Sequence, residues 1–208
     1  EATMAGQSEI TMFRSLQHPG ALAVTLAAAG ILMVTMGSRQ SLGLIIAPLN
    51  ADTNLGIVTI SLALAVGQFM WGATQPVAGA VADRFGPGRV LLGGLLLLAL
   101  GSSATPFMND TWGLVFSLGL LSAVGSGASS FSVLIGAATT RLPLEARGAA
   151  SGIINAGGSF GQFIFAPILQ KLIQAMGWMG AMWALALVTL AALPLVRIHR
   201  GICALSRP

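Results

Sequence analysis

Apolar stretches alternate with short polar islands along most of this 208-residue chain. A helix of about 20 apolar residues is long enough to cross the hydrocarbon core of a bilayer, which is roughly 30 Å thick. Only 8% of the residues are charged, whereas 55% are hydrophobic and the mean hydropathy is +0.84. No soluble globular domain has this balance. The sequence therefore predicts an all-α membrane protein.

The breaks between the apolar stretches predict six transmembrane helices. The predicted spans are 20–48, 56–81, 88–106, 112–139, 148–171 and 178–197. On this division residues 1–19 form a cytoplasmic N-terminal segment, residues 20–197 a six-helix bundle, and residues 198–208 a cytoplasmic tail.

The basic residues orient this predicted bundle, because cytoplasmic ends of membrane helices collect Lys and Arg. One set of helix ends would carry nearly all of them: Arg14, Arg84, Arg89, Arg141, Arg147, Arg197, Arg200 and Arg207. The opposite ends would carry Lys171 with the acids Asp52 and Asp110. We therefore expect a multi-pass protein of the cell membrane with both termini in the cytoplasm.

A charged island, GAVADRFGPGRV at residues 79–90, falls in the cytoplasmic turn between the second and third predicted spans. A positive-inside anchor would explain its two arginines but not Asp83 or the glycine spacing. Five of its residues resemble the signature G-x-x-x-D-R-x-G-x-x-[RK] of the major facilitator superfamily: Gly79, Asp83, Arg84, Gly86 and Arg89. One departure is that Pro87 and Gly88, rather than an arginine, follow the second glycine.

This resemblance implies a twelve-helix fold built from two six-helix halves, of which this chain would be the N-terminal half. It also implies that the five residues of the signature act as a conformational latch, in which the charges hold the two halves in one state.

A second resemblance indicates one branch of this superfamily. Residues 147–181 look like the fifth helix and following turn of the monocarboxylate and oxalate/formate carriers. The matching positions are Arg147, Gly148, Gly152, Ala156, Gly157, Gly161, Pro167, Gln170, Gly177, Trp178, Gly180 and Ala181. Residues 37–49 are similar to the S-F-G-x-F element of the same carriers, with Leu42 where Phe is common. We expect Gly152, Gly157, Gly161 and Pro167 to serve helix packing, because small residues let membrane helices approach closely.

Arg39 is the only charged residue well inside a predicted span. Charges at such depth are costly and usually face a cavity and a functional partner. One interpretation is that the first span ends early and Arg39 snorkels to the outer interface. The other is that its guanidinium binds an anionic substrate, since this group pairs with carboxylate in bidentate geometry. The branch resemblance favours the second, because these carriers associate a cationic side chain on the first helix with carboxylate substrates.

Polar side chains at helical spacing give further candidates for a substrate cavity. Gln68 lies on the second predicted span, and Asn155 and Gln162 lie on the fifth. In a bilayer such side chains face protein or water rather than lipid. The alternative is that these amides only join neighbouring helices.

The predicted function is secondary active transport of a small organic anion, such as a monocarboxylate, by alternating access. A coupled proton or counter-anion, membrane lipid, and either a missing C-terminal half or a second copy of the chain would be its partners. Two alternatives stay open: a half-carrier that serves only as a structural pairing unit, and a carrier for another small solute.

Other classes of function are disfavoured by the residues themselves. No His, Cys, Asp or Glu lies well inside a predicted span, so the sequence predicts no enzyme, and we expect no metal site and no cofactor. The chain has a single cysteine, which excludes a multi-cysteine metal site. A formal net charge of only +4 argues against a nucleic-acid partner.

Overall fold

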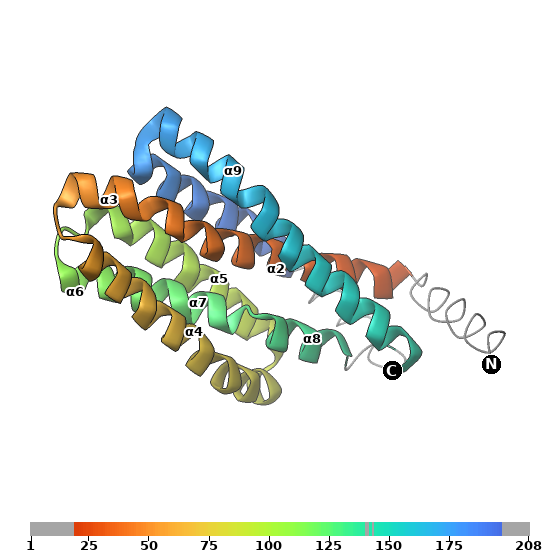
Figure 1. Ribbon diagram of the computed structural model, residues 1–208. Coiled ribbons are helices and arrows are strands. Elements are labelled where there is room, and N and C mark those ends of the chain that lie inside the picture. Colours follow the sequence, from red (N-terminus) through yellow and green to blue (C-terminus); the bar gives the residue numbers. More distant parts are fainter. Residues whose placement is uncertain (1–18, 140–141, 143, 197–208) are drawn as a thin grey trace, which may run out of the picture.

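The structure is a computed structural model that describes residues 19–139, 142 and 144–196, and this part of the chain is helical almost throughout (Figure 1). The elements, in chain order, are α2 (Pro19–Ser41), the 3₁₀ turn η1 (Leu42–Ile45), α3 (Ile46–Thr53), α4 (Ile57–Phe85), α5 (Pro87–Ala104), the 3₁₀ turn η2 (Thr105–Phe107), α6 (Thr111–Leu114), the π-helical segment η3 (Val115–Ser122), α7 (Ala123–Ala128), α8 (Phe131–Thr139) and α9 (Leu144–Ala191). Among these residues no strand occurs, so the predicted all-α class is confirmed.

Five helical stretches in the described part are long and apolar enough to cross a membrane. They are Gly20–Thr53, Ile57–Phe85, Pro87–Phe107, Thr111–Ala138 and Ala146–Val196. The last is 51 residues long and leaves helical geometry at Gly177, where φ is 75°. Figure 1 shows the chain reversing within α9, so that its two arms run side by side. Four single spans and one folded span agree with the six predicted helices.

Several predicted helix ends were wrong, because single glycines replace the expected loops. Helix α4 continues to Phe85 rather than stopping at residue 81, and the first arm of α9 continues past residue 171 up to Gly177. Gly86 and Gly177 have φ values of 90° and 75°, a left-handed region that glycine enters without steric cost. Pro87 then begins α5 at a position where a missing N–H costs nothing.

The first predicted span is also longer than expected. The helix passes through η1 into α3 and ends at Thr53, not at residue 48. Asn54, with φ of 53°, caps this helix and its N–H donates to the carbonyl of Asn50 at 3.0 Å. Asparagine tolerates this conformation, which explains where the helix ends. The predicted terminal segments lie outside the described residues, except that α2 already includes Pro19.

Helices α2 and α9 pack closely because glycines meet backbone between them. A Cβ at Gly157 would lie 2.7 Å from the carbonyl oxygen of Ala29, and a Cβ at Gly161 would overlap the carbonyl of Met33. Gly152 differs, because nothing lies within 4 Å of the position of its Cβ. No neighbouring helix therefore requires a glycine at this position, and the packing role expected of Gly152 stays a prediction. Pro167 lies inside α9 on an exposed position.

A hydrogen bond joins parts of the chain that are far apart in sequence at one end of the bundle. The indole N–H of Trp178, which is 4% exposed, donates to the carboxylate of Asp52 at the end of α3. The turn after α3 and helix α6 lie at this same end, whereas the turn between α4 and α5 and the start of α9 lie at the other (Figure 1). Trp178 therefore anchors the second arm of α9 to the end of the first span.

Candidate functional site

Arg39 lies well inside the first helical stretch. The stretch runs from Gly20 to Thr53. At about 1.5 Å per residue, Arg39 is roughly 28 Å from Gly20 and roughly 21 Å from Thr53 along the helix. Its side chain is half-buried. The helix does not end early, because it continues for more than three turns beyond Arg39. That Arg39 faces a substrate cavity stays a prediction.

Helix α4 holds the guanidinium of Arg39 in place. The Nη2–H group of Arg39 donates to Oε1 of Gln68, and its Cζ atom lies 4.5 Å from the centroid of the Trp71 ring. Residues three apart on a helix share one face, so Gln68 and Trp71 reach Arg39 together. A cation above an aromatic face is attracted by the ring quadrupole. Among the side chains that the structure describes, no carboxylate pairs with Arg39, and its described partners are an amide and a ring.

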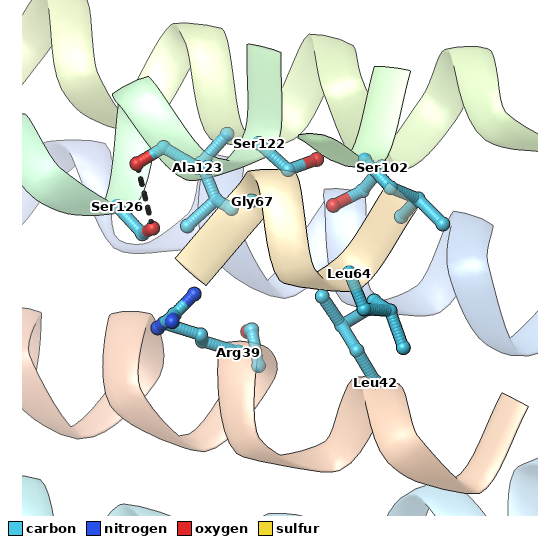
Figure 2. Close-up of a pocket in the computed structure, with 11 residues that line it drawn as sticks. Arg39, Leu42, Leu64, Gly67, Ser102, Ser122, Ala123 and Ser126 are labelled. Carbon is cyan, nitrogen blue, oxygen red and sulfur yellow. Dashed lines mark hydrogen bonds between the residues drawn. The ribbon is translucent and has the colours of Figure 1, made fainter. Parts of the chain in front are cut away.

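Arg39 also lines a small pocket in the interior of the bundle (Figure 2). The apolar part of the lining comes from leucines, Gly67 and Ala123. The other polar side chains are serines, one each from α2, α5, η3 and α7: Ser38, Ser102, Ser122 and Ser126. In Figure 2 the guanidinium reaches from α2 past α4 toward the segment that carries Ser122 and Ser126. The cavity measures about 20 Å³, enough for one water molecule or one oxygen atom.

The other two predicted binding residues are placed on α9. Asn155 is exposed and Gln162 is half-buried, and neither has a described hydrogen bond to Arg39. The structure thus brings Arg39 and Gln68 together but does not join them to Asn155 or Gln162. Their role in a substrate site stays a prediction.

Sequence reasoning missed Trp71, Ser38 and Ser102. The signal for Trp71 was its spacing of three from Gln68, which puts both on one face of a helix. Ser38 is adjacent to Arg39 and could have been noticed for that reason. Ser102 had no signal, because one serine near the end of a leucine-rich span is unremarkable in sequence.

The predicted latch residues lie where α4 meets α5. Gly79, Asp83 and Gly86 line a cavity of about 350 Å³ whose other wall is helix α8. Asp83 and Arg84 occupy the last turn of α4, and Arg89 the first turn of α5, with all three side chains exposed. The Cζ atom of Arg84 lies 5.5 Å from the centroid of the neighbouring Phe85 ring. Within the described residues none of the three charges forms an ion pair.

Comparison with known proteins identifies the superfamily to which the chain belongs. The family model of the Major Facilitator Superfamily matches residues 28–201, and the chain belongs to this superfamily. With several apolar helices of spanning length, it is a multi-pass membrane protein. The resemblance stated from residues 79–90 is thereby confirmed.

Three relatives also support the resemblance to monocarboxylate carriers. The chain is 34% identical over 134 residues to monocarboxylate transporter 11 of Homo sapiens, covering 64% of this chain and 27% of that protein. It is 36% identical over 131 residues to monocarboxylate transporter 13 of Bos taurus, covering 62% and 29%. It is 30% identical over 138 residues to the probable sulfoacetate transporter SauU of Cupriavidus necator, covering 65% and 32%. The matched part therefore spans about a third or less of each relative's length. All three relatives are named as transporters rather than enzymes.

Proposed function

We propose that this chain forms one half of a secondary carrier for a small organic anion, such as a monocarboxylate. The observation that carries the proposal is Arg39, a cation inside an apolar span that no described carboxylate neutralises. A charge at the centre of a membrane helix costs about 2.5 to 3.5 kcal/mol even on the mildest scale. A bound carboxylate would offset that cost by pairing with the guanidinium.

The contacts of Arg39 leave it able to bind such an anion. A guanidinium has five N–H donors, and the described hydrogen bond to Gln68 uses one nitrogen. The ring of Trp71 covers a face of the group and leaves its donor edges available. Asn155 and Gln162 would supply further polar contacts from α9. The names of the relatives, which specify monocarboxylates and sulfoacetate, support an acid as substrate.

In this proposal the substrate binds between two six-helix halves, and the halves rock to expose it to each side of the cell membrane in turn. The second half is either a further part of the same protein or a second copy of this chain. A proton or a counter-anion would be coupled to the movement. Both termini would face the cytoplasm, which puts the described arginines Arg84, Arg89 and Arg147 on the cytoplasmic side.

The exposed charges of the latch would act at that cytoplasmic side. Asp83, Arg84 and Arg89 have no described ion-pair partners and would contact the other half in the outward-facing state. Gly86 allows α4 and α5 to turn within one residue, which presents the three charges together. The latch would stabilise one state without touching the substrate.

We therefore expect Asp83→Asn to lower the maximal transport rate by roughly tenfold, the size of a typical coupling between conformational states, while the Kd for substrate changes little. Rates and affinities would be measured in proteoliposomes and by equilibrium binding. Asp110→Asn is the matched control, because Asp110 lies at the opposite end and asparagine can replace it as the cap of α6. A weaker affinity with a normal rate in Asp83→Asn would contradict the latch.

The experiment that tests the function uses the complete natural gene product in proteoliposomes. Uptake of labelled lactate would be measured with unlabelled lactate, acetate and sulfoacetate as competitors, and with lactamide as the uncharged counterpart of lactate. We expect one or more of the acids to compete and the amide to be without effect, because only the acids can pair with Arg39. Equal competition by lactamide would point to a carrier for another solute, and absence of any uptake to a non-transporting half.

A further inference from the structure

Two hydroxyl groups in the Arg39 pocket have no hydrogen-bond partner in the described chain: Ser38 Oγ and Ser122 Oγ. Their side chains are 2% and 3% exposed, so bulk water does not reach them. Buried polar groups in folded proteins almost always have a partner, either protein or ordered water. The two hydroxyls are therefore free to donate to a molecule that enters the pocket.

Neighbouring serines show that this state is not general for helical serines here. Ser41, one turn after Ser38, donates to the carbonyl of Gly37 at 2.8 Å. Ser117, in the same π-helical segment as Ser122, donates to the carbonyl of Leu114 at 3.5 Å and accepts from Thr105 at 3.3 Å. Three other buried atoms lack a described partner, but they lie outside the lining of this pocket: Ser129 Oγ, Ser130 Oγ and Trp71 Nε1.

The backbone around Ser122 gives its hydroxyl this position. The π-helical segment Val115–Ser122 ends at this residue. Such segments are rare in proteins overall, and those that occur are often at functional sites. On the facing helix α5, a Cβ at Gly101 would overlap both the hydroxyl and the backbone N–H of Ser122. The side chain of Ser122 therefore fits only because residue 101 is a glycine.

Arg39, which lines the pocket, also bonds to Gln68 outside the lining. Gln68 is exposed and Arg39 half-buried, whereas both serines are buried. A volume of about 20 Å³ admits one oxygen atom but no complete organic acid. An acid group held by the guanidinium would therefore place a single oxygen in the pocket.

We propose that this pocket is an oxyanion subsite, in which Arg39 binds the acid group of the substrate while the hydroxyls of Ser38 and Ser122 donate to the oxygen that points inward. This rests on the proposed function, because it takes the substrate to be a carboxylate or a sulfonate. Hydroxyl donors to a charged oxygen form stronger hydrogen bonds than those between neutral groups. The water that fills the pocket without substrate is displaced when the acid binds.

The test compares two pairs of alanine variants of the full-length carrier, with lactate and sulfoacetate as the probes. Ser38→Ala and Ser122→Ala remove hydroxyls that bond to no described protein atom, so each should raise the Kd of the acid that binds by roughly tenfold. The melting temperature without ligand should not fall in either variant. The controls Ser41→Ala and Ser117→Ala remove bonds already made within the protein, so they should lower that temperature and leave the Kd unchanged.

The outcomes separate this proposal from the function on which it rests. An unchanged Kd in both Ser38→Ala and Ser122→Ala would mean that the pocket holds water only, which overturns the subsite while leaving the anion carrier intact. A wild-type protein that binds neither acid would overturn both. A loss of affinity in Ser38→Ala and Ser122→Ala that Ser41→Ala and Ser117→Ala share would also overturn the subsite, because the effect would then be one of folding.

Discussion

Replacing Arg39 by glutamine is expected to abolish the binding of organic anions while the helical bundle stays folded. Glutamine is neutral and cannot form the bidentate, charge-assisted pair with a carboxylate. Each hydrogen bond to a charged group contributes about 1.5 to 3 kcal/mol, so the loss of two should weaken binding by about a hundredfold or more. Folding should survive, because the substitution removes a costly charge from an apolar span and leaves a polar group that can still meet Gln68.

The measurement is equilibrium binding of lactate and sulfoacetate, with circular dichroism to verify the fold. Arg39→Lys should fall between glutamine and wild type, since it keeps the charge but presents no planar fork of donors. Lys171→Gln removes a cation from an exposed position on α9 and serves as the control with unchanged binding. Wild-type affinity in Arg39→Gln would remove Arg39 from the substrate site.

Gly161→Ala is expected to destabilise the bundle by about 1 to 3 kcal/mol, the usual cost of overpacking. The added Cβ would overlap the backbone of Met33, and a backbone carbonyl inside a helix cannot move aside as a flexible side chain can. Separation of α2 from α9 would then loosen the contact at Gly157 and Ala29 as well. Thermal unfolding in detergent would show this as a lower melting temperature.

Gly152 offers the matched control in the same helix. Nothing lies within 4 Å of a Cβ built there, so Gly152→Ala should leave the stability unchanged or raise it by up to about 1 kcal/mol through better helix propensity. Equal stability of Gly161→Ala and Gly152→Ala would mean that α2 and α9 do not approach as closely as the structure shows.

Hydropathy could predict the number and order of the helices but not how they are joined. Residues 172–176 continue the helix although they precede a turn, because their sequence LIQAM suits a helix as well as a loop. The π-helical geometry of Val115–Ser122 was equally invisible, since VFSLGLLS is an ordinary apolar helix sequence. Such features depend on packing against Gly101 and other residues distant in sequence, which a single-sequence pattern does not reveal.

The site could be predicted where charge made a residue exceptional. Arg39 stood out because a cation in an apolar span is costly, and the structure places it beside Gln68. Trp71 and the pocket serines carried no such signal, because aromatic and small residues are common in membrane helices for packing alone. Their importance follows only from the way α2, α4, α5, η3 and α7 come together around the pocket.

The hydroxyl groups of α2 have a consequence for the way the protein is made. Thr25 donates to Ala21, Thr35 to Leu32 and Ser41 to Gly37, all carbonyls of the same helix. Synthesis proceeds from the N-terminus, so α2 enters the bilayer long before its partner α9, which begins at Leu144, has left the ribosome. Unpaired polar groups in lipid cost several kcal/mol each, and these three hydroxyls avoid that cost because their acceptors lie on α2 itself. These hydroxyl groups therefore do not need α9 to be present when α2 enters the bilayer.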